Sequence, residues 1–322
     1  MSKTAQTTTQ KPKFVNIAIM EPDSLFTVKQ ISIGFASELV TNEVLACRFT
    51  PYNARGDAAL LYQNAQEIIQ EKYDLVFSIG GTCSEAIKKV TAQHRVDIPI
   101  VFADVMDPYR LDLIKTADKP GGNMTGVISL NHNYNTHFSY LLRLQPQIKN
   151  ALIVYNSLEE GGLIKKEKEN LVSRLSSWGI KTQEVAVFHK MEIAGAVKHQ
   201  IEMSRPDVIF TLRDFSVLAA LPDLMKIAYK YSLPVFTSDL AAVNAGSTFG
   251  SGFSNSNMGI HGSKQAKMIL VDNRHPQSIP LVTQSESYLV RVNSNTIERQ
   301  GIQLSKETLR WVYENGETVW GL

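Results

Sequence analysis

The stretch "YDLVFSIGGTCSEA", residues 73–86, has a counterpart in "PDVIFTLRDFSVLAA", residues 206–220. Each stretch runs from a short apolar segment through polar residues into a segment of helical periodicity, a pattern typical of a buried strand followed by a helix. Each is followed by a further apolar run, "IPIVFADV" at 98–105 and "LPVFTSDL" at 233–240. The repetition predicts two halves built on one strand–helix plan, and no short solenoid repeat.

The same alternation extends outward from both stretches. In the first half it predicts strands at 15–20, 44–50, 75–79 and 98–103, and helices at 24–39, from the N-cap Asp57 to Gln70, and at 84–90. In the second half it predicts strands at 151–157, 182–188, 207–214 and 233–239, and helices at 163–178, 191–203 and 216–231. Strands that alternate with helices indicate an α/β fold with parallel sheets covered on both faces.

The bulk composition excludes several classes of protein. A chain of 322 residues with 43% hydrophobic and 20% charged residues has the length of two globular domains. Its formal charge of +2 gives no reason to expect a nucleic-acid partner. The two cysteines, Cys47 and Cys83, have no metal-ligand spacing, so we expect no metal, no cofactor and no disulfide, with Cys47 a small buried hydrophobic residue.

The N-terminal residues 1–14 read as a flexible polar tail. The apolar run that follows, "FVNIAIM", is too short to span a bilayer, and the sequence as written shows no signal peptide. Two interpretations stay open. The protein is cytoplasmic, or a leader was removed and the tail is the tether of an extracytoplasmic lipoprotein.

The search for a functional site follows from the fold. In open α/β sheets, ligands bind at the carboxyl ends of the strands, so each half contributes the loops that follow its strands. The candidates in these loops mix glycines and hydroxyls with carboxylates, one arginine and two aromatics. They are Glu21, Ser78, Gly80, Gly81, Thr82, Cys83, Asp104, Asp107, Tyr155, Asn156, Glu160, Thr211, Arg213, Asp214, Phe215, Ser238 and Asp239.

The Gly-Gly-Thr-Cys turn at 80–83 allows three interpretations. It lacks the spacing of a nucleotide phosphate loop. A nucleophilic Cys83 would need a base, and His94 lies about three helical turns along while the other six histidines are far from it in sequence. We favour an anion cradle made by the backbone N–H groups of Gly81, Thr82 and Cys83 at a helix N-terminus, with a turn that merely ends a strand as the plain alternative.

The carboxylates also have local roles open to them. Asp104 or Asp107 can bond nearby backbone in an Asx turn before Pro108, as an alternative to acid/base or metal chemistry. Asp214 can cap a helix or receive an ammonium group, and Arg213 can pair with it or with a ligand carboxylate. Tyr155 and Phe215 can stack on a ligand, although aromatics beside strands are more often core.

Several motifs, in order along the chain, resemble one family. They are "IPIVFADVMDPYRLDLI" (98–114), "KPGGNMTGV" (119–127), "LIVYNSLEEGG" (152–162), "LPVFTSDLAAVNAG" (233–246), "MGIHGSKQAKMIL" (258–270) and "VNSNTIERQGI" (292–302). Together they resemble ABC-transporter substrate-binding proteins of the tryptophan/tyrosine-binding type, over residues 14–305.

The resemblance implies a periplasmic-binding-protein-like type I fold. Two Rossmann-like lobes would be joined by a hinge that the chain crosses three times, with a ligand cleft between them. Lobe 1 would comprise residues 15–128 and 256–285, the latter largely a helix, and lobe 2 residues 129–255 and 286–322. It also implies a monomer without enzymatic activity that captures a small molecule and closes over it, with an ABC permease and its ATPase subunits as partners.

The family's ligand loops fall on 78–82, 104–107, 155–160, 211–216 and 238–239. In amino-acid-binding members the acidic residue after the third strand of the second lobe would take the ligand's ammonium, which here is Asp214. This sequence departs from the family in having Arg213 before that aspartate and Phe215 after it. With an anion cradle in one half and Asp214 in the other, we expect a zwitterion, an amino acid with an aromatic side chain among the candidates.

Other functions are alternatives at this point. Within the binding class, the ligand could be a sugar, a nucleoside or another polar metabolite, or the chain could be a sensor domain. A ligand without an ammonium group would leave Asp214 unpaired in a closed site, which is costly. Outside that class, an α/β enzyme would use Asp104, Asp107 or Cys83.

Overall fold

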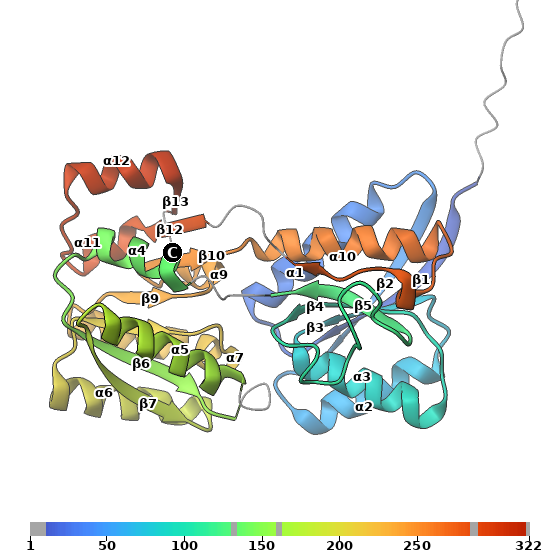
Figure 1. Ribbon diagram of the computed structural model, residues 1–322, viewed down its shortest axis with the longest axis horizontal. Coiled ribbons are helices and arrows are strands. Elements are labelled where there is room, and N and C mark those ends of the chain that lie inside the picture. Colours follow the sequence, from blue (N-terminus) through green and yellow to red (C-terminus); the bar gives the residue numbers. More distant parts are fainter. Residues whose placement is uncertain (1–10, 130–133, 159–162, 284–288, 320–322) are drawn as a thin grey trace, which may run out of the picture. The chain divides into compact units, whose positions relative to one another are not determined.

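The computed structural model describes residues 11–129, 134–158, 163–283 and 289–319. The chain divides into two units (Figure 1). The first comprises Met1–Ser24, Gln30–Ser129 and Ser256–Thr283, and the second comprises Leu25–Lys29, Leu130–Asn255 and Gln284–Leu322. Each unit contains one β-sheet with helices packed on it.

The first unit has a six-stranded sheet in the order β11-β5-β4-β3-β1-β2, and every pair of neighbouring strands is parallel. The strands are β1 (Lys13–Glu21), β2 (Leu45–Asn53), β3 (Leu75–Ile79), β4 (Ile100–Val105), β5 (Met124–Ile128) and β11 (Val282–Thr283). The helices are α1 (Phe26–Val40), α2 (Ala58–Gln70), α3 (Gly81–His94), α10 (Asn255–Leu270) and the short 3-10 helix η3 (Pro276–Ser278).

The helices of the first unit cover both faces of its sheet (Figure 1). Because side chains alternate along a strand, Val76 packs in the core under α2 and α3, while its neighbour Phe77 faces the other way. There the ring of Phe77 stacks on that of Phe35 from α1, with centroids 3.8 Å apart. Asp57 caps α2 as predicted, since its carboxylate accepts hydrogen bonds from the N–H groups of Ala59 and Leu60.

The second unit has a seven-stranded sheet in the order β13-β12-β10-β9-β8-β6-β7, parallel except for the β10–β12 pair. The strands are β6 (Asn150–Asn156), β7 (Lys181–Val187), β8 (Val208–Thr211), β9 (Val235–Thr237), β10 (Phe249–Gly252), β12 (Leu289–Asn293) and β13 (Gly316–Val319). The helices are α4 (Tyr134–Leu144), α5 (Leu163–Ser177), η2 (Lys190–Glu192), α6 (Ile193–Ser204), α7 (Phe215–Ala219), α8 (Leu221–Lys230), α9 (Leu240–Asn244), α11 (Ser294–Arg299) and α12 (Lys306–Asn315).

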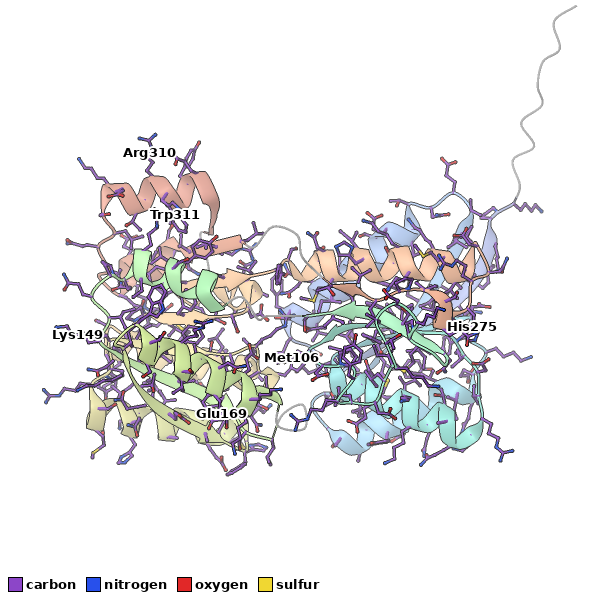
Figure 2. The ribbon with its side chains drawn as sticks, in the orientation of Figure 1. Met106, Lys149, Glu169, His275, Arg310 and Trp311 are labelled. Carbon is purple, nitrogen blue, oxygen red and sulfur yellow. The ribbon has the colours of Figure 1, made fainter. Side chains whose placement is uncertain are left out.

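One buried cluster of the second unit lies between its sheet and helices α6, α7 and α8, and it includes Ile209, Val217 and Leu224. The C-terminal helix α12 carries Trp311, labelled in Figure 2. Its ring lies against Tyr140 of α4, and the guanidinium of Arg143 sits 4.9 Å from its centroid. This contact attaches α12 to α4.

Three expectations from the sequence are wrong in detail. The helix predicted at 216–231 is two helices, because Pro222 lies in the first turn of α8, where a residue without an N–H is tolerated, and α7 has already ended at Ala219. The helix expected near 256–285 ends at Leu270, and the chain then returns to the sheet as β11. Cys47 is of intermediate exposure and not fully buried.

Candidate functional site

In the first unit, the candidates after β1, β3 and β4 meet at the carboxyl edge of the sheet. The register pairs Met20 with Ser78 and Ser78 with Phe102, so these three strands end side by side. Glu21, Gly80 and Asp104 therefore lie at neighbouring strand ends, as the sequence predicted. Met106, labelled in Figure 2, follows β4 directly.

The Gly-Gly turn leads straight into α3. Gly80 is the N-cap residue with φ of 83°, a left-handed conformation that favours glycine, and it makes no side-chain cap hydrogen bond. The N–H groups of Gly81, Thr82 and Cys83 stand in the first turn, where an α-helix supplies no backbone carbonyl for them. Thr82 is exposed, so this end of α3 reaches solvent. The geometry fits the predicted anion cradle.

The hydroxyl of Ser78 is linked to this turn through hydrogen bonds. It lies 2.9 Å from the hydroxyl of Ser84, which in turn donates to the carbonyl of Gly80 at 2.8 Å. Both serines are fully buried. Ser84, which the sequence analysis did not single out, thus holds the strand end and the helix start together.

Glu21 lies beside this turn with both carboxylate oxygens engaged. Oε1 accepts from the hydroxyl of Ser32 at 2.6 Å, and Oε2 accepts from the amide of Asn53 at 3.1 Å. The same amide donates to the carbonyl of Asp23 at 2.6 Å. The charges of Glu21 and Asp23 are close enough to Cys83, in the first turn of α3, to contribute to the raised pKa of its thiol.

Cys83 is a core side chain. It is 0% exposed and packs in the cluster that includes Met20 and Ala86. Burial, with smaller contributions from the charges of Asp23 and Glu21, raises the pKa of the Cys83 thiol well above its ordinary value. A nucleophilic thiolate needs the opposite shift, so the geometry gives Cys83 a backbone role at the turn.

The two aspartates after β4 differ in role. Asp107 forms the predicted Asx turn, because its Oδ1 accepts from the N–H groups of Tyr109 and Arg110 at 3.2 and 3.0 Å. Asp104 is buried and has φ of 60°, at an irregularity in the pairing of β4 with β5. Aspartate tolerates this left-handed conformation better than most residues, and such backbone gathers at functional sites.

In the second unit, the ends of β6, β8 and β9 come together in the same way. The register pairs Val154 with Thr211 and Thr211 with Thr237, so the loops that follow these strands share one edge. This edge carries the predicted residues Tyr155, Asn156, Thr211, Arg213, Asp214, Phe215, Ser238 and Asp239. Glu160 lies outside the described residues.

Asp214 is the N-cap of α7. It is fully buried, its carboxylate accepts from the N–H of Val217 at 2.9 Å, and it also accepts from the N–H of Asn156. The side-chain amide of Asn156 donates to the hydroxyl of Ser216 at 3.1 Å. The capping alternative for Asp214 is thereby confirmed, and Asn156 belongs to the same network.

The two aromatic candidates have different surroundings. Tyr155 is buried, and its hydroxyl donates to Glu184 at 3.2 Å while Lys168 lies over its ring. Lys168 and Glu184 form an ion pair at 2.8 Å, and neither was singled out from the sequence. Phe215, by contrast, is only partly buried at the start of α7. Of the two rings, that of Phe215 is the more exposed and therefore the more accessible to a ligand.

Arg213 and Asp239 form a buried ion pair, with Nη1 3.8 Å from Oδ2. The hydroxyls of Thr211 and Ser238 are also buried, and neither has a hydrogen-bond partner among the described residues. Polar atoms in this state at a strand edge are suited to a bound molecule or water. Within the same residues, no group of three or more His, Cys, Asp or Glu side chains could hold a metal ion.

Comparison with known proteins gives a family. Residues 15–314 match the sequence model of the family described as ABC transporter substrate binding protein. The tyrosine-binding protein of Clostridioides difficile is 22% identical over 261 residues, covering 81% of this chain and 72% of that protein.

Two solved structures have the same fold. A conserved domain protein from Vibrio cholerae aligns with a TM-score of 0.84 and 23% identity, covering 95% of this chain and all of that one. An ABC domain from Streptococcus pneumoniae, in complex with L-Trp, aligns with a TM-score of 0.81 and 22% identity over 94% of this chain and all of that one. The predicted α/β class with two lobes and largely parallel sheets is confirmed.

The chain belongs to the ABC transporter substrate-binding protein family. Proteins of this family are extracytoplasmic components of importers, which carry a small molecule to a membrane permease. In the described part of this chain, no helix combines the length and apolar character needed to cross a bilayer.

Proposed function

We propose that this member of the family binds an amino acid, with an aromatic side chain preferred, and delivers it to an ABC permease. The observation that carries the proposal is the uncapped N-terminus of α3, which offers the N–H groups of Gly81, Thr82 and Cys83 to a carboxylate. The name of the Clostridioides difficile relative and the ligand of the Streptococcus pneumoniae structure support the choice of an aromatic amino acid.

The ammonium group of the ligand would be received by Asp214. Its carboxylate accepts two backbone N–H groups, from Asn156 and Val217. An ionised carboxylate can accept an ammonium proton in addition to backbone N–H groups. The partly buried ring of Phe215 follows directly and would contact the side chain of the ligand.

A thermal-shift screen against the twenty amino acids, nucleosides and common sugars tests the ligand class. A molecule that binds only the folded chain stabilises it by about 2.7 kcal/mol at one hundred times its Kd. We expect the largest rise in midpoint with L-tryptophan or L-tyrosine. A larger rise with a sugar or nucleoside, or no rise with any amino acid, would refute the proposal.

Calorimetry with ligand analogues then tests the two ends of the site. The analogues are the amide, which lacks the carboxylate, and the desamino acid, which lacks the ammonium. In Asp214→Asn the amide oxygen can keep the cap bond from Val217 N–H, because Asn is as good an N-cap as Asp, whereas the amide nitrogen replaces the oxygen that accepts from Asn156 N–H. We expect this variant to lose about 2–5 kcal/mol for the amino acid, the range for truncating a buried charged pair, and far less for the desamino acid.

Glu21→Gln is the matched control, since Glu21 is the acidic candidate at the edge of the first unit. We expect its affinity for the amino acid to stay close to that of the unmodified chain. If Asp214→Asn lost equal affinity for the amide and for the desamino acid, Asp214 would contribute by holding the local structure and not by binding the ammonium group. A selective loss in Glu21→Gln would move the ammonium site to the first unit.

A further inference from the structure

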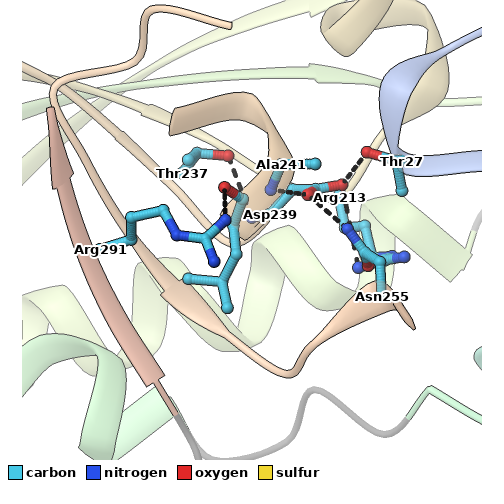
Figure 3. Close-up of polar contacts among 8 residues, drawn as sticks. Thr27, Arg213, Thr237, Asp239, Ala241, Asn255 and Arg291 are labelled. Atoms are coloured by element: carbon cyan, nitrogen blue, oxygen red, sulfur yellow. Dashed lines mark hydrogen bonds and ion pairs between the residues drawn. The ribbon is translucent and has the colours of Figure 1, made fainter. Parts of the chain in front are cut away.

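The carboxylate of Asp239 contacts side chains from several distant parts of the chain (Figure 3). Its Oδ2 accepts from the hydroxyl of Thr27 at 2.8 Å and lies 3.8 Å from Nη1 of Arg213. Its Oδ1 accepts from the N–H of Ala241 at 2.7 Å and from the side-chain amide of Asn255 at 3.2 Å. Only the bond to Ala241, at the start of α9, is local.

These groups are all withdrawn from water. Asp239 is 0% exposed, Thr27 3% and Asn255 2%, and the side chain of Arg213 is 7% exposed. A buried carboxylate is costly unless its charge is paired and its oxygens accept hydrogen bonds. Because the partners of Asp239 provide this compensation together, movement of any one of them leaves the carboxylate less well satisfied.

Thr27 and Asn255 stand where the chain passes between the two units. Thr27 lies in Leu25–Lys29, the short segment of the second unit after which α1 continues in the first unit from Gln30. Asn255 is the last residue of the second unit, and α10 continues in the first unit from Ser256. The first turns of α1 and α10 are thus held by one carboxylate.

Beyond these turns, α1 and α10 pack at backbone distance. A Cβ on Gly34 of α1 would lie 2.2 Å from the carbonyl oxygen of Ser256, and one on Gly259 of α10 would lie 2.1 Å from that of Ile31. Both contacts require glycine, so the two helices are closely packed and a shift of one toward the other would bring backbone atoms into collision.

We propose that Asp239 is a positioning residue that anchors this helix pair to the second unit and so restrains the turning of one unit relative to the other. A rotation of α1 and α10 together either takes place about Asp239 or breaks its bonds to Thr27 and Asn255. The inference goes beyond the proposed function, because it does not depend on which ligand is bound.

The test measures distances between the units in the ligand-free, full-length chain. Spin labels on cysteines placed at the exposed positions Lys72 and Lys198, in a Cys47→Ser background, report one distance distribution by pulsed electron paramagnetic resonance. Thr27→Val removes the hydroxyl at nearly constant volume and leaves Asp239 in place. Asp239→Asn removes the charge of the carboxylate. If Asp239→Asn does not fold, the distance measurement on Thr27→Val still tests the proposal.

Thr125→Val is the matched control. Thr125 is also fully buried, and its hydroxyl donates to the carbonyl of Ile279 at 2.8 Å, a bond between distant segments that both lie in the first unit. We expect both threonine variants to unfold at lower urea concentration. Only Thr27→Val should broaden and shift the distance distribution.

Two results would overturn the proposal. One is a Thr27→Val distribution that coincides with that of the unmodified labelled chain. The other is a Thr125→Val distribution that changes as much as that of Thr27→Val, since a general loss of stability would then account for both. Because no ligand is added, neither result bears on whether the chain binds an amino acid.

Discussion

Asp214 and Asp239 occupy the same place in two successive strand-to-helix turns, yet their surroundings differ. Each caps a short helix, with Asp214 accepting from Val217 N–H and Asp239 from Ala241 N–H. Asp214 also accepts from the distant Asn156 N–H, whereas Asp239 accepts from Thr27 and Asn255 and pairs with Arg213. The cap follows from the residue type and its place after a strand. The additional partners come from far along the chain and follow from the fold.

At the residue scale, the two thiols should differ in reactivity. Cys83 is fully buried with a raised pKa, whereas Cys47 is partly exposed. With a chromogenic disulfide reagent, we expect Cys47→Ser to show no fast-reacting thiol in the native state and one in denaturant. The control is Cys83→Ala, which should keep the native reaction of Cys47. Rapid native labelling of Cys47→Ser would contradict the buried position of Cys83.

At the element scale, the structure separates two helical glycines that the sequence does not distinguish. A Cβ on Gly259 of α10 would meet the Ile31 carbonyl oxygen at 2.1 Å and the Phe35 nitrogen at 2.5 Å. A Cβ on Gly195 of α6 would meet nothing within 4 Å. One glycine permits close helix packing, and the other only weakens its helix.

The pair Gly259→Ala and Gly195→Ala tests this difference by urea unfolding. We expect Gly259→Ala to destabilise the chain by about 1–3 kcal/mol, the usual range for overpacking. Gly195→Ala should stabilise it by up to about 1 kcal/mol, because alanine is the better helix former. Equal effects of the two substitutions would show that α1 and α10 are not closely packed.

The elements themselves were largely predictable. Short apolar runs that alternate with helical segments predicted β3, β4, β6 and β8. Asp57 predicted the start of α2. The division at Pro222 was missed, because the apolar periodicity of 216–231 continues through it. Periodicity records which face is buried, whereas the missing N–H of proline decides where a helix can start.

At the scale of the whole molecule, stability should fall in alkaline solution. Burial raises the pKa values of Cys83 and Tyr155, and that of Tyr52 is raised by burial and by its bond to Tyr73. Burial works to lower the pKa of Lys168, but the hydrogen bond and charge of Glu184 outweigh it and raise that pKa. All four groups therefore hold their protons more tightly in the folded chain.

The sign follows from proton linkage. As pH rises above about 8.5, the unfolded chain releases these protons first, so it binds fewer than the folded chain and the free energy of unfolding decreases. We expect a lower urea midpoint at pH 9.5 than at pH 7. Cys83→Ala should reduce the slope between those values. A midpoint that holds or rises at pH 9.5 would contradict the direction of these shifts.

The sequence by itself determined the α/β class, the two strand–helix halves, the Gly-Gly turn before α3 and the family. These features depend on residues that are close in sequence, since periodicity, turn residues and motif spacing all involve neighbours in the chain. The predicted site residues after β1, β3 and β4, and after β6, β8 and β9, share sheet edges because parallel strands end together.

Only the tertiary structure decided which polar groups meet. No local sequence pattern predicts that the hydroxyl of Thr27 donates to Asp239. The same holds for the hydrogen bond between the hydroxyls of Ser78 and Ser84. It also holds for the ion pair of Lys168 with Glu184 beside the ring of Tyr155. A buried polar group takes whichever partner the packing brings within about 3 Å, and packing depends on every element at once. For this reason the sequence could name Asp239 and Arg213 as candidates, while their pairing came only from the fold.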